Sequence, residues 1–420
     1  MRNKNKLKQF GQKHILMLEA YFFPETVASN QMLLDYCKAL ADNGYFVTIY
    51  CPIPTRGVTK ETRKKYRRKK TEVLDSGVLI KRFFLMNEGK NFFLRFLRYL
   101  VMNIKQFFYA LFHKYDLLLL NSTPPTNGLL GGLLKSIKRK PFIYYLHDVF
   151  PDSMVNMGVI KQKSLICKVG RMLEKYTYKK ANRIIAVSNG IKANIIQKGV
   201  DANKTVVVYN WVDDNRINFV SKSNNSLINE FGIDSTKFIV CYAGNIGAAQ
   251  GIETLIETAI MLKDDSKIQF VIIGNGVKMQ ECKDLSAKNN LNNVTFIPMQ
   301  NQDRLSEVYS LGDVSVVACK PGFGNACMPS KAASIMSAST AILASFDLDS
   351  ELAKIIVDNN LGVCVEPSNA KALKETILFF ANNRELCSKY GNNGRLFLEN
   401  NMSKSICTKS IVNVIRDCIG

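Results

Sequence analysis

The chain lacks the residues that a metal site or a disulfide framework would need. Its 420 residues include only three histidines, and none of its eleven cysteines forms a CxxC pair, which argues against a zinc site. The number of cysteines is odd, and several lie in apolar runs such as FIVCYAG. We therefore expect mostly buried thiols, reduced in a reducing compartment.

Long apolar runs are missing as well. The apolar stretch near the N-terminus is short, contains Glu19 and lacks a cleavage site of small residues, so we interpret it as a first strand behind a basic tail and not as a signal peptide. No stretch approaches the roughly 20 uninterrupted apolar residues of a membrane-spanning helix. The sequence therefore predicts a soluble or peripheral protein.

Acidic residues are scarce in the first half of the chain. Residues 1–200 hold 36 Lys and Arg against 12 Asp and Glu, whereas residues 201–420 hold 21 against 23. A basic-leaning proteome would not explain why only one half is basic. The asymmetry indicates an anionic partner, either nucleic acid or an anionic membrane surface. Because no nucleic-acid-reading motif accompanies the charge, we expect the membrane surface and no nucleic acid.

Two segments of this basic half suit a membrane surface. The run KETRKKYRRKK, residues 60–70, carries eight Lys and Arg, and we interpret it as a flexible loop because neither a strand nor a helix can bury it. Residues 91–115 predict a helix with an apolar, core-facing stripe and a second, basic and aromatic face that suits a membrane interface. An ordinary core helix with a few exposed aromatic side chains fits nearly as well. The stripe comprises residues 93, 96, 97, 100, 101, 104, 107, 108 and 111, and the second face comprises Leu94, Arg95, Arg98, Tyr99, Met102, Lys105, Tyr109, Phe112 and Lys114.

Short apolar runs alternate with helical segments along the chain. Seven such runs lie between residues 14 and 210, and six lie between residues 237 and 367. Apolar, β-branched runs that alternate with helices indicate parallel sheets covered on both faces. We therefore expect two doubly wound α/β domains, residues 1–210 and 211–402, with a polar boundary near residues 211–225 and a final helix over about residues 403–420.

Two glycine-containing turns follow apolar runs of the second domain. Gly244 and Gly247 lie in the first turn, just before a helix, and Gly274 and Gly276 lie in the second. Ligands gather at the carboxyl ends of parallel strands, where glycine lets the backbone approach them closely. The helix N-terminus behind the first turn offers N–H groups to a phosphate. Either turn alone can be an ordinary tight turn, but the pair favours a nucleotide pocket.

In each domain, one further predicted strand is followed by polar residues that could bind a ligand or take part in catalysis. Lys320 and Lys331 lie near the same edge of the second domain, and Ser330 is the expected N-cap of the next helix. A lysine at a helix start opposes the helix dipole, so a diphosphate is a fitting partner for Lys331, with a solvated surface lysine as the alternative. In the first domain, His147 and Asp148 end an apolar strand. The histidine could hold a sugar hydroxyl or stabilise charge, or merely satisfy local backbone.

Together these segments resemble family 4 glycosyltransferases of the GT-B fold, and within them the group of bacterial N-acetyl-fucosaminyl transferases of surface-polysaccharide assembly. The resemblance covers about residues 14–415. The segments are specific for the family together and not singly. They are FFPETVAS, HDVFPDSMVNMG, RIIAVSNGIKANIIQKGV, VVYNWVD, YAGNIGAAQGIETLIE, FVIIGNG, DVSVVACK, MPSKAASIMSA and FDLDSEL.

The resemblance implies two Rossmann-like domains that face each other across a cleft, with the final helix packed back onto the first domain. It implies transfer of a sugar, an N-acetylated amino or deoxyamino sugar, from a UDP-sugar to an acceptor hydroxyl with retention of configuration and without a metal or cofactor. The acceptor would be a polyprenyl-diphosphate-linked glycan for capsule or O-antigen. The protein would then be cytoplasmic and peripheral on the inner face of the cytoplasmic membrane.

The resemblance also assigns site residues. His147 would touch the donor sugar, and His147, Asp148 and Lys331 form the expected catalytic set. The expected donor-binding residues are Gly244, Asn245, Gly247, Gln250, Gly274, Gly276, Lys320, Ser330, Asp349 and Glu351, and the expected loop near donor and acceptor contains Glu25, Ala28 and Ser29.

The chain departs from the family pattern in three places. Many members have Glu-x7-Glu before the last large helix, but PGFGNACMPSKAAS contains no glutamate, so Asp347, Asp349 and Glu351 are candidate substitutes. The basic residues often found after the first glycine turn are replaced by AAQ, which ends at Gln250. The first-domain loop ETVASN has no paired glycines, which leaves Ala28 and Ser29 to permit close approach.

Two other hypotheses fit parts of the sequence. A UDP-sugar 2-epimerase shares the fold, but should show paired acidic and histidine residues for proton transfer. A non-catalytic protein that binds a membrane or nucleic acid would account for the basic half alone. The transferase accounts for the charge, the amphipathic segment and the glycine turns together.

Overall fold

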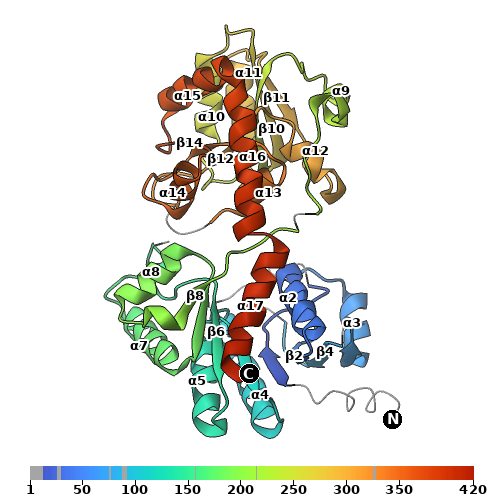
Figure 1. Ribbon diagram of the computed structural model, residues 1–420, viewed down its shortest axis with the longest axis vertical. Coiled ribbons are helices and arrows are strands. Elements are labelled where there is room, and N and C mark those ends of the chain that lie inside the picture. Colours follow the sequence, from blue (N-terminus) through green and yellow to red (C-terminus); the bar gives the residue numbers. More distant parts are fainter. Residues whose placement is uncertain are drawn as a thin grey trace. The chain divides into compact units, whose positions relative to one another are not determined.

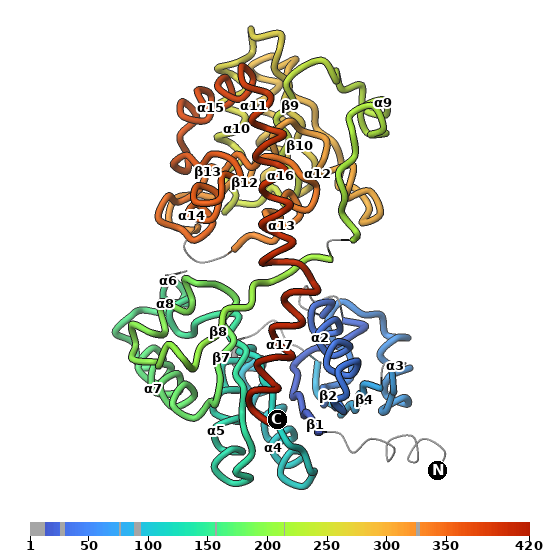
Figure 2. The backbone as a smooth tube through the Cα atoms, in the orientation of Figure 1, coloured from blue at the N-terminus to red at the C-terminus, as the bar shows by residue number. Residues whose placement is uncertain are grey.

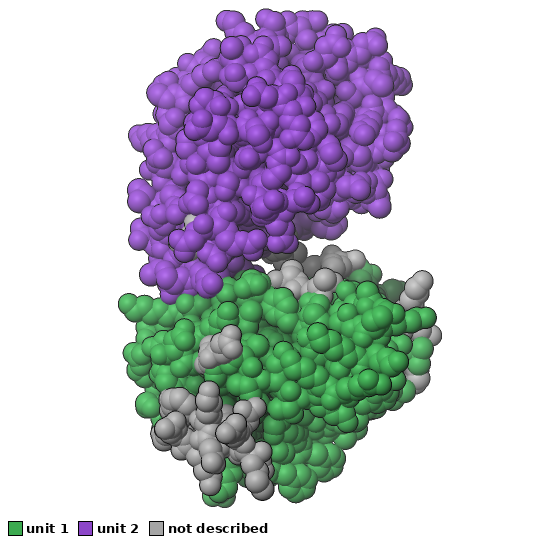
Figure 3. All heavy atoms as spheres, turned by 90° about the vertical axis from the view of Figure 1, so that its right-hand side faces the viewer, with its two compact units in different colours: residues 1–209, 407–420 green, residues 210–406 purple. Residues whose placement is uncertain are grey.

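The computed structural model describes residues 13–25, 30–74, 77–87, 92–156, 158–213, 215–324 and 328–420 (Figure 1). The chain divides into two compact units. Unit 1 comprises residues Met1–Tyr209 and Cys407–Gly420, and unit 2 comprises Asn210–Ile406 (Figure 3). The end of the chain, residues 407–420, thus belongs to the same unit as its first half.

Unit 1 is built on a sheet with the strand order β3-β4-β2-β1-β5-β6-β7-β8. Its neighbouring strands pair in parallel, except that β3 pairs antiparallel with β4. The order reverses between β1 and β5, and such a switch point is where open α/β sheets bind ligands. The strands are β1 His14–Leu18, β2 Phe46–Pro52, β3 Thr71–Val73, β4 Leu79–Phe83, β5 Leu117–Asn121, β6 Phe142–Leu146, β7 Arg183–Ala186 and β8 Thr205–Val207.

Helices pack against both faces of this sheet. On one face, Leu130, Leu134 and Tyr178 join Phe142 in a single core cluster. On the other face, the Cys37 thiol lies 3.4 Å from the Met17 sulfur, and the rings of Tyr36 and Tyr145 lie 6.0 Å apart. The helices of this unit are α2 Asn30–Asp42, α3 Lys60–Arg68, α4 Phe92–Phe112, α5 Thr126–Lys138, α6 Asp152–Asn156, α7 Leu165–Lys180, α8 Asn189–Gln197 and most of α17, Lys404–Ile419.

The basic run at residues 60–70 forms a helix, so its interpretation as a flexible loop is wrong. The Thr59 hydroxyl caps α3 by accepting a hydrogen bond from the Thr62 amide at 3.2 Å. Arg63 donates to the Leu85 carbonyl oxygen at 3.2 Å, and the Arg67 guanidinium lies 5.2 Å from the Phe84 ring centroid. No described residue of α3 is buried. Capping and contacts with the end of β4 hold this helix without burying its charges.

The predicted helix at residues 91–115 exists as α4, but the face expected to lie in the core points outward. Side chains of the apolar stripe, such as Phe96, Ile104 and Phe108, are about half exposed, whereas Arg98 and Met102 are buried. Arg98 is accommodated because its guanidinium donates to the Met86 carbonyl oxygen and the Thr55 hydroxyl. Apolar periodicity alone could not reveal this, since both faces of α4 carry large apolar residues.

Unit 2 contains a fully parallel sheet with the order β11-β10-β9-β12-β13-β14. Its core cluster includes Phe238, Phe270 and Phe380, all with no exposed surface. The strands are β9 Phe238–Asn245, β10 Ile268–Asn275, β11 Val294–Ile297, β12 Val314–Ala318, β13 Ala341–Ser345 and β14 Gly362–Val365. The helices are α9 Ser226–Glu230, α10 Glu253–Met261, α11 Met279–Lys288, α12 Leu305–Tyr309, α13 Ser330–Ser337, α14 Glu351–Asp358, α15 Ala370–Asn382 and α16 Arg384–Asn401.

All thirteen predicted strands are present, and β3 is the additional one. The ten cysteines within the described residues form no disulfide with one another. Eight of them are buried, and their apolar surroundings predicted this burial. Among the described residues, every helix is too short or too polar to cross a bilayer.

Candidate active site

The two predicted glycine turns lie side by side in unit 2. β9 and β10 pair in register, so that Gly244 lies opposite Gly274 and Asn245 lies opposite Asn275 at the carboxyl ends of the strands. A Cβ atom on Gly274 would stand 1.9 Å from the Gly244 carbonyl oxygen. The backbone at both glycines also has a positive φ, 139° and 152°, which side-chain-bearing residues rarely adopt. Close approach of two backbones therefore requires glycine at this edge.

The remaining turn residues hold the first glycine turn in shape. The Gln250 side-chain oxygen accepts hydrogen bonds from the Gly247 amide at 3.1 Å and from the Asn245 side chain at 3.2 Å. A Cβ on Gly276 would stand 2.3 Å from the Ile246 carbonyl oxygen. The turn is thus held by contacts among its own residues. Gln250 hydrogen-bonds Asn245 and Gly247, and Gly276 packs against the backbone of the turn.

Lys331 extends over this turn from α13. Its ammonium donates a hydrogen bond to the Tyr242 hydroxyl at 2.8 Å and lies 4.0 Å from the centroid of that ring. A Cβ on Gly244 would stand 3.0 Å from the same nitrogen. The Tyr242 hydroxyl in turn donates to the Asn245 carbonyl oxygen at 2.6 Å. Tyr242, which sequence reasoning missed, therefore fixes both the lysine and the turn.

The charge of Lys331 is only partly compensated within the part of the chain that the structure describes. Burial lowers the pKa of Lys331 to about 8, and no ion pair links it to a carboxylate there. A partly buried ammonium beside a neutral hydroxyl and an aromatic face is costly unless an anion joins it. The arrangement suits an anionic ligand at the Gly244 turn.

Lys320 also approaches the turn, but its ammonium faces a carboxylate. Its backbone amide donates to the Ala249 carbonyl oxygen at 2.9 Å, and its ammonium lies 3.9 Å from Glu253. Glu253 lies in the first turn of α10 and also faces Lys278, at 3.6 Å. One Glu253 oxygen is buried without a hydrogen-bond partner. Glu253 and Lys278 are further neighbours of the turn that sequence reasoning did not single out.

Ser330 is not the N-cap that its sequence position suggested. The capping residue of α13 is Pro329, and no side chain caps this end. Ser330 is instead the first residue of the helix and is exposed. Proline fixes the extended backbone before the helix, so the serine is displaced by one position.

The three candidate substitutes for the missing glutamates lie after β13 and at the start of α14, and two of them, Asp347 and Asp349, line the same pocket. Asp347 accepts hydrogen bonds from the Gly322 and Gly324 amides at 2.9 and 2.7 Å and so holds the loop after β12. Asp349 lines an open pocket of about 420 Å³ at the ends of β13 and β14. Glu351 begins α14. The other residues that line the pocket are Pro321, Asp347, Leu348, Glu366 and Pro367.

In unit 1, His147 and Asp148 follow β6 as predicted. The Ser122 hydroxyl accepts hydrogen bonds from both of their amides, at 3.0 and 3.3 Å. The His147 ring stacks on Tyr145 with centroids 4.3 Å apart, and burial lowers the pKa of His147 to about 4. His147 is therefore neutral at pH 7 and can act through a hydrogen bond rather than through charge.

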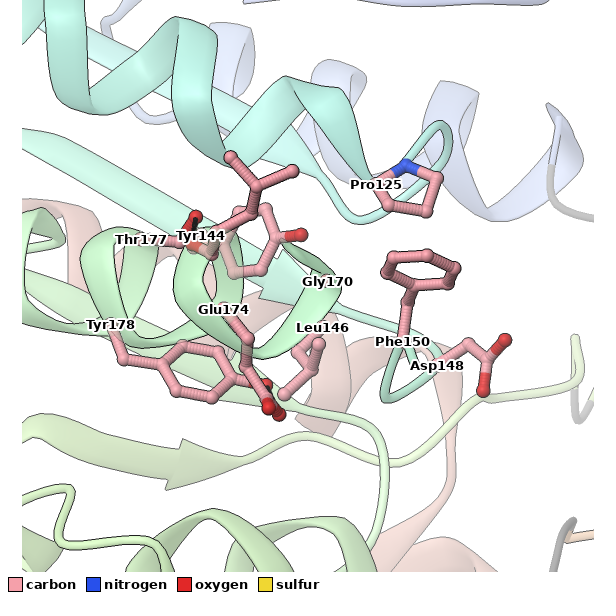
Figure 4. Close-up of a pocket in the computed structure, with 10 residues that line it drawn as sticks. Pro125, Tyr144, Leu146, Asp148, Phe150, Gly170, Glu174, Thr177 and Tyr178 are labelled. Carbon is pink, nitrogen blue, oxygen red and sulfur yellow. Dashed lines mark hydrogen bonds between the residues drawn. The ribbon is translucent and has the colours of Figure 1, made fainter. Parts of the chain in front are cut away.

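Asp148 also borders a small, partly open cavity of about 20 Å³, enough for one water molecule. In Figure 4, Asp148 points away from the group formed by Tyr144, Glu174 and Tyr178. The cavity is too small for a sugar, so we do not assign it to a substrate. The other residues that line it are Pro125, Leu146, Phe150, Gly170, Leu173 and Thr177.

The first-domain loop is described only in part. Ala28 and Ser29 lie outside the described residues. Glu25 is buried, and its carboxylate accepts hydrogen bonds from the amides of Phe22, Thr55 and Arg56 at 3.2, 2.7 and 2.9 Å. Burial raises the pKa of Glu25 while these amides oppose the rise. In the structure, Glu25 therefore fixes the backbone at Phe22, Thr55 and Arg56.

A buried polar ring at the switch point of the unit 1 sheet was not predicted. Asn121, the last residue of β5, donates a hydrogen bond to the Glu19 carboxyl group, and Asn127 donates to the Asn121 carbonyl oxygen. Asn103 of α4 donates to both Asn127 and Gln106, and Gln106 donates to the Glu19 carbonyl oxygen. The ring joins the ends of β1 and β5 to α4 and α5. The one sequence signal was an acidic residue at the end of an otherwise apolar strand.

Glu19 is the acidic member of this ring. Burial raises the pKa of Glu19 to about 8, against an opposing hydrogen bond from Asn121. Its second carboxyl oxygen is buried without a partner. The side chain is therefore mostly protonated at pH 7.

Comparisons with known proteins match each half of the chain to a glycosyltransferase family. Residues 29–216 match the model of Glycosyltransferase Family 4, and residues 223–397 match the model of Glycosyl transferases group 1. The chain is 26% identical over 288 residues to WcaI of Escherichia coli strain K12, whose name assigns it to colanic acid biosynthesis as a glycosyl transferase; the match covers 68% of this chain and 70% of WcaI. It is 24% identical over 305 residues to the capsular polysaccharide biosynthesis glycosyltransferase CapM of Staphylococcus aureus, covering 70% and 76%.

Solved structures show the same fold. HepE of Anabaena in complex with UDP superposes with a TM-score of 0.71 at 15% identity, over 97% of this chain and 100% of that chain. Three observations indicate the same fold family: the two units with parallel sheets, the two family models and the likeness to HepE. The chain belongs to the glycosyltransferases of the GT-B fold, with a family 4 N-terminal half and a group 1 C-terminal half.

Proposed function

We propose that the protein transfers a sugar from a UDP-sugar to a polyprenyl-diphosphate-linked glycan during synthesis of a surface polysaccharide such as capsule or O-antigen. The observation that carries the proposal is the Lys331 ammonium, held by Tyr242 over the Gly244 turn without an ion-paired carboxylate in the described part of the chain. A nucleotide diphosphate supplies the anion that this lysine lacks.

The relatives support the choice of substrates. HepE binds UDP and UDP-glucose in its solved complexes, and the names of WcaI and CapM refer to colanic acid and capsular polysaccharide. We propose an N-acetylated amino or deoxyamino sugar as the transferred group. The acceptor class would bring the protein to the inner face of the cytoplasmic membrane as a cytoplasmic, peripheral enzyme.

In the proposed mechanism, the protein accelerates transfer mainly by stabilising charge. The leaving diphosphate assists the incoming acceptor hydroxyl on the same face of the sugar, which retains configuration and needs no metal or protein nucleophile. Lys331 would neutralise the developing charge on the diphosphate in a partly dry site, where such stabilisation is strongest. Neutral His147 would hold a sugar hydroxyl, and the neighbouring Asp148 would orient the sugar or the acceptor.

A donor screen with an acceptor requirement tests the proposal. The purified chain is incubated with a panel of UDP-sugars, with and without polyprenyl-diphosphate glycan and in the presence of EDTA, and released UDP and the product anomer are measured. We expect UDP release from one donor only when acceptor is present, undiminished by EDTA, with retained configuration. Conversion of the donor sugar without acceptor would support a 2-epimerase instead, and absence of UDP binding would exclude both.

A further inference from the structure

The outer face of α4 carries an unusual amount of exposed apolar surface. Among the side chains of α4 that the structure describes, seven large apolar ones are at least 36% exposed: Leu94 47%, Phe96 52%, Leu97 36%, Leu100 45%, Ile104 48%, Phe108 52% and Phe112 76%. Single exposed apolar residues are common, but a contiguous patch along a helix marks an interaction site. We refer to these seven residues as the α4 surface.

The opposite side of α4 already has its partners, so the outward side is not a displaced core face. Arg98, Met102, Gln106 and Ala110 are buried with at most 1% exposure. They recur at intervals of four residues and therefore line one side of the helix. The orientation of α4 is fixed by these contacts, which leaves the α4 surface toward the outside of unit 1.

Exposed apolar side chains also lie on the neighbouring helix α5. Lys138 of α5 donates a hydrogen bond to the Leu111 carbonyl oxygen at 2.9 Å, which holds the ends of α4 and α5 together, and Figure 2 shows the two helices side by side. Leu133 and Ile137 of α5 are 41% and 54% exposed. Two neighbouring helices of unit 1 thus both expose apolar side chains.

The charged side chains on α4 and α5 are all basic. α4 and α5 contain no Asp or Glu, whereas Arg95 and Lys105 are exposed on α4. The basic helix α3 lies next to them, because Phe84 contacts both helices. Its ring lies 5.2 Å from the Arg67 guanidinium, and its carbonyl oxygen accepts a hydrogen bond from Lys105 at 2.9 Å. Apolar surface and exposed cations therefore adjoin.

We propose that the α4 surface inserts into the headgroup region of an anionic bilayer, with the cations of α3 drawing it there. This inference rests on the proposed function only in that a polyprenyl-linked acceptor resides in such a bilayer. A helix with an apolar face and flanking cations lies in the interface plane, with its apolar side about 5–10 Å deep. The area does not suit a second copy of the chain, since that contact would set cations against cations.

Vesicle co-sedimentation of the full chain tests the proposal with three sets of substitutions. The first replaces Leu100, Ile104 and Phe108 by Ser. The second replaces Lys64, Arg67 and Arg68 by Ser. The matched control replaces three exposed apolar residues of unit 2 by Ser: Val277, Val357 and Phe379, which are 85%, 60% and 47% exposed.

We expect the wild type and the control to bind vesicles of phosphatidylglycerol and phosphatidylcholine, and to bind pure phosphatidylcholine much less. The first variant should lose at least about tenfold in partitioning at low and at high salt, because each buried apolar side chain contributes independently of ionic strength. The second should lose binding mainly at low salt, since salt screens exposed charges.

Three results would overturn the proposal. They are unchanged vesicle binding by the first variant, equal loss in the control, or a wild-type dimer without lipid that the first variant dissociates. UDP protection against thermal unfolding is measured on every variant in parallel. If vesicle binding follows the expected pattern while UDP gives no protection, the proposed function fails and the membrane surface stands. Intact UDP protection in the first variant also shows that its fold is retained.

Discussion

The Lys331 ammonium and the Tyr242 ring are in direct contact, with the nitrogen 2.8 Å from the hydroxyl and 4.0 Å from the ring centroid. The contact joins the start of α13 to β9 through two residues that are 89 positions apart in the sequence. It holds a lysine over the Gly244 turn without neutralising its charge. Under the proposed function, the contact would position the ammonium for the donor diphosphate before the donor binds.

Replacement of Lys331 by Ala tests this position directly. We expect sugar transfer to fall by about a hundredfold or more, as when one preorganised charge-stabilising group is removed, and UDP protection against unfolding to weaken. Assays of UDP release and thermal shift measure the two effects. The matched control is Lys371→Ala, at an exposed lysine of α15, which should change neither. Wild-type activity in Lys331→Ala would remove Lys331 from the site.

Gly274 is the second position to test, since its neighbour leaves no room for a side chain. In Gly274→Ala the new Cβ would stand 1.9 Å from the Gly244 carbonyl oxygen, so the two strand ends must separate. We expect a loss of about 2 kcal/mol or more in stability, together with weakened UDP binding. Gly322→Ala is the control, because that glycine also has a positive φ but has no atom within 4 Å of the new Cβ. If both variants lost similar stability, the effect would come from the positive φ of the backbone and not from the contact with Gly244.

The buried Glu19 predicts a dependence of stability on pH. Burial raises the pKa of Glu19 from 4.5 to about 8. Between these values the unfolded chain has released the proton while the folded chain retains it, so stability falls as the pH rises from about 4.5 to about 8. In Glu19→Gln this contribution disappears. The variant should therefore be more stable than wild type at pH 8, by up to about 1.4 kcal/mol for each unit of pKa shift.

Thermal unfolding at pH 5, 6.5 and 8 measures this contribution. Glu61→Gln is the matched control, because Glu61 is exposed on α3 and its replacement should leave the slope unchanged. Equal slopes for wild type and Glu19→Gln would show that Glu19 is not the group responsible.

The lowered pKa of His147 predicts that, at lower pH, the stability of the fold rises with pH. Burial lowers the pKa of His147 from 6.5 to about 4, so the unfolded chain binds a proton that the folded chain excludes. Its contribution to stability is complete above pH 6.5 and is lost as the pH falls toward 4. Transfer should therefore show no ionisation of His147 between pH 6 and 8. His147→Asn, which keeps hydrogen-bonding capacity, should retain more activity than His147→Ala; equal activities of wild type and both variants would exclude a contact with the substrate.

The sequence alone determined the strands, the two units and the paired glycine turns. Strands such as β9 and β10 are continuous apolar runs that end in Gly-Asn, and these patterns are local. Parallel pairing in a doubly wound sheet then brings neighbouring carboxyl ends to one edge, so the meeting of Gly244 and Gly274 followed from general rules of the fold.

Tertiary structure decided which of two plausible faces became the core and which polar groups met. The sequence shows apolar residues on both sides of α4. The hydrogen-bond acceptors on Met86 and Thr55 allow Arg98, rather than Phe108, to be the buried side chain. The contact of Tyr242 with Lys331 and the hydrogen bonds that join Glu19 to Asn121 span distant positions. Their formation depends on how helices pack on the sheet, which periodicity along the chain does not encode.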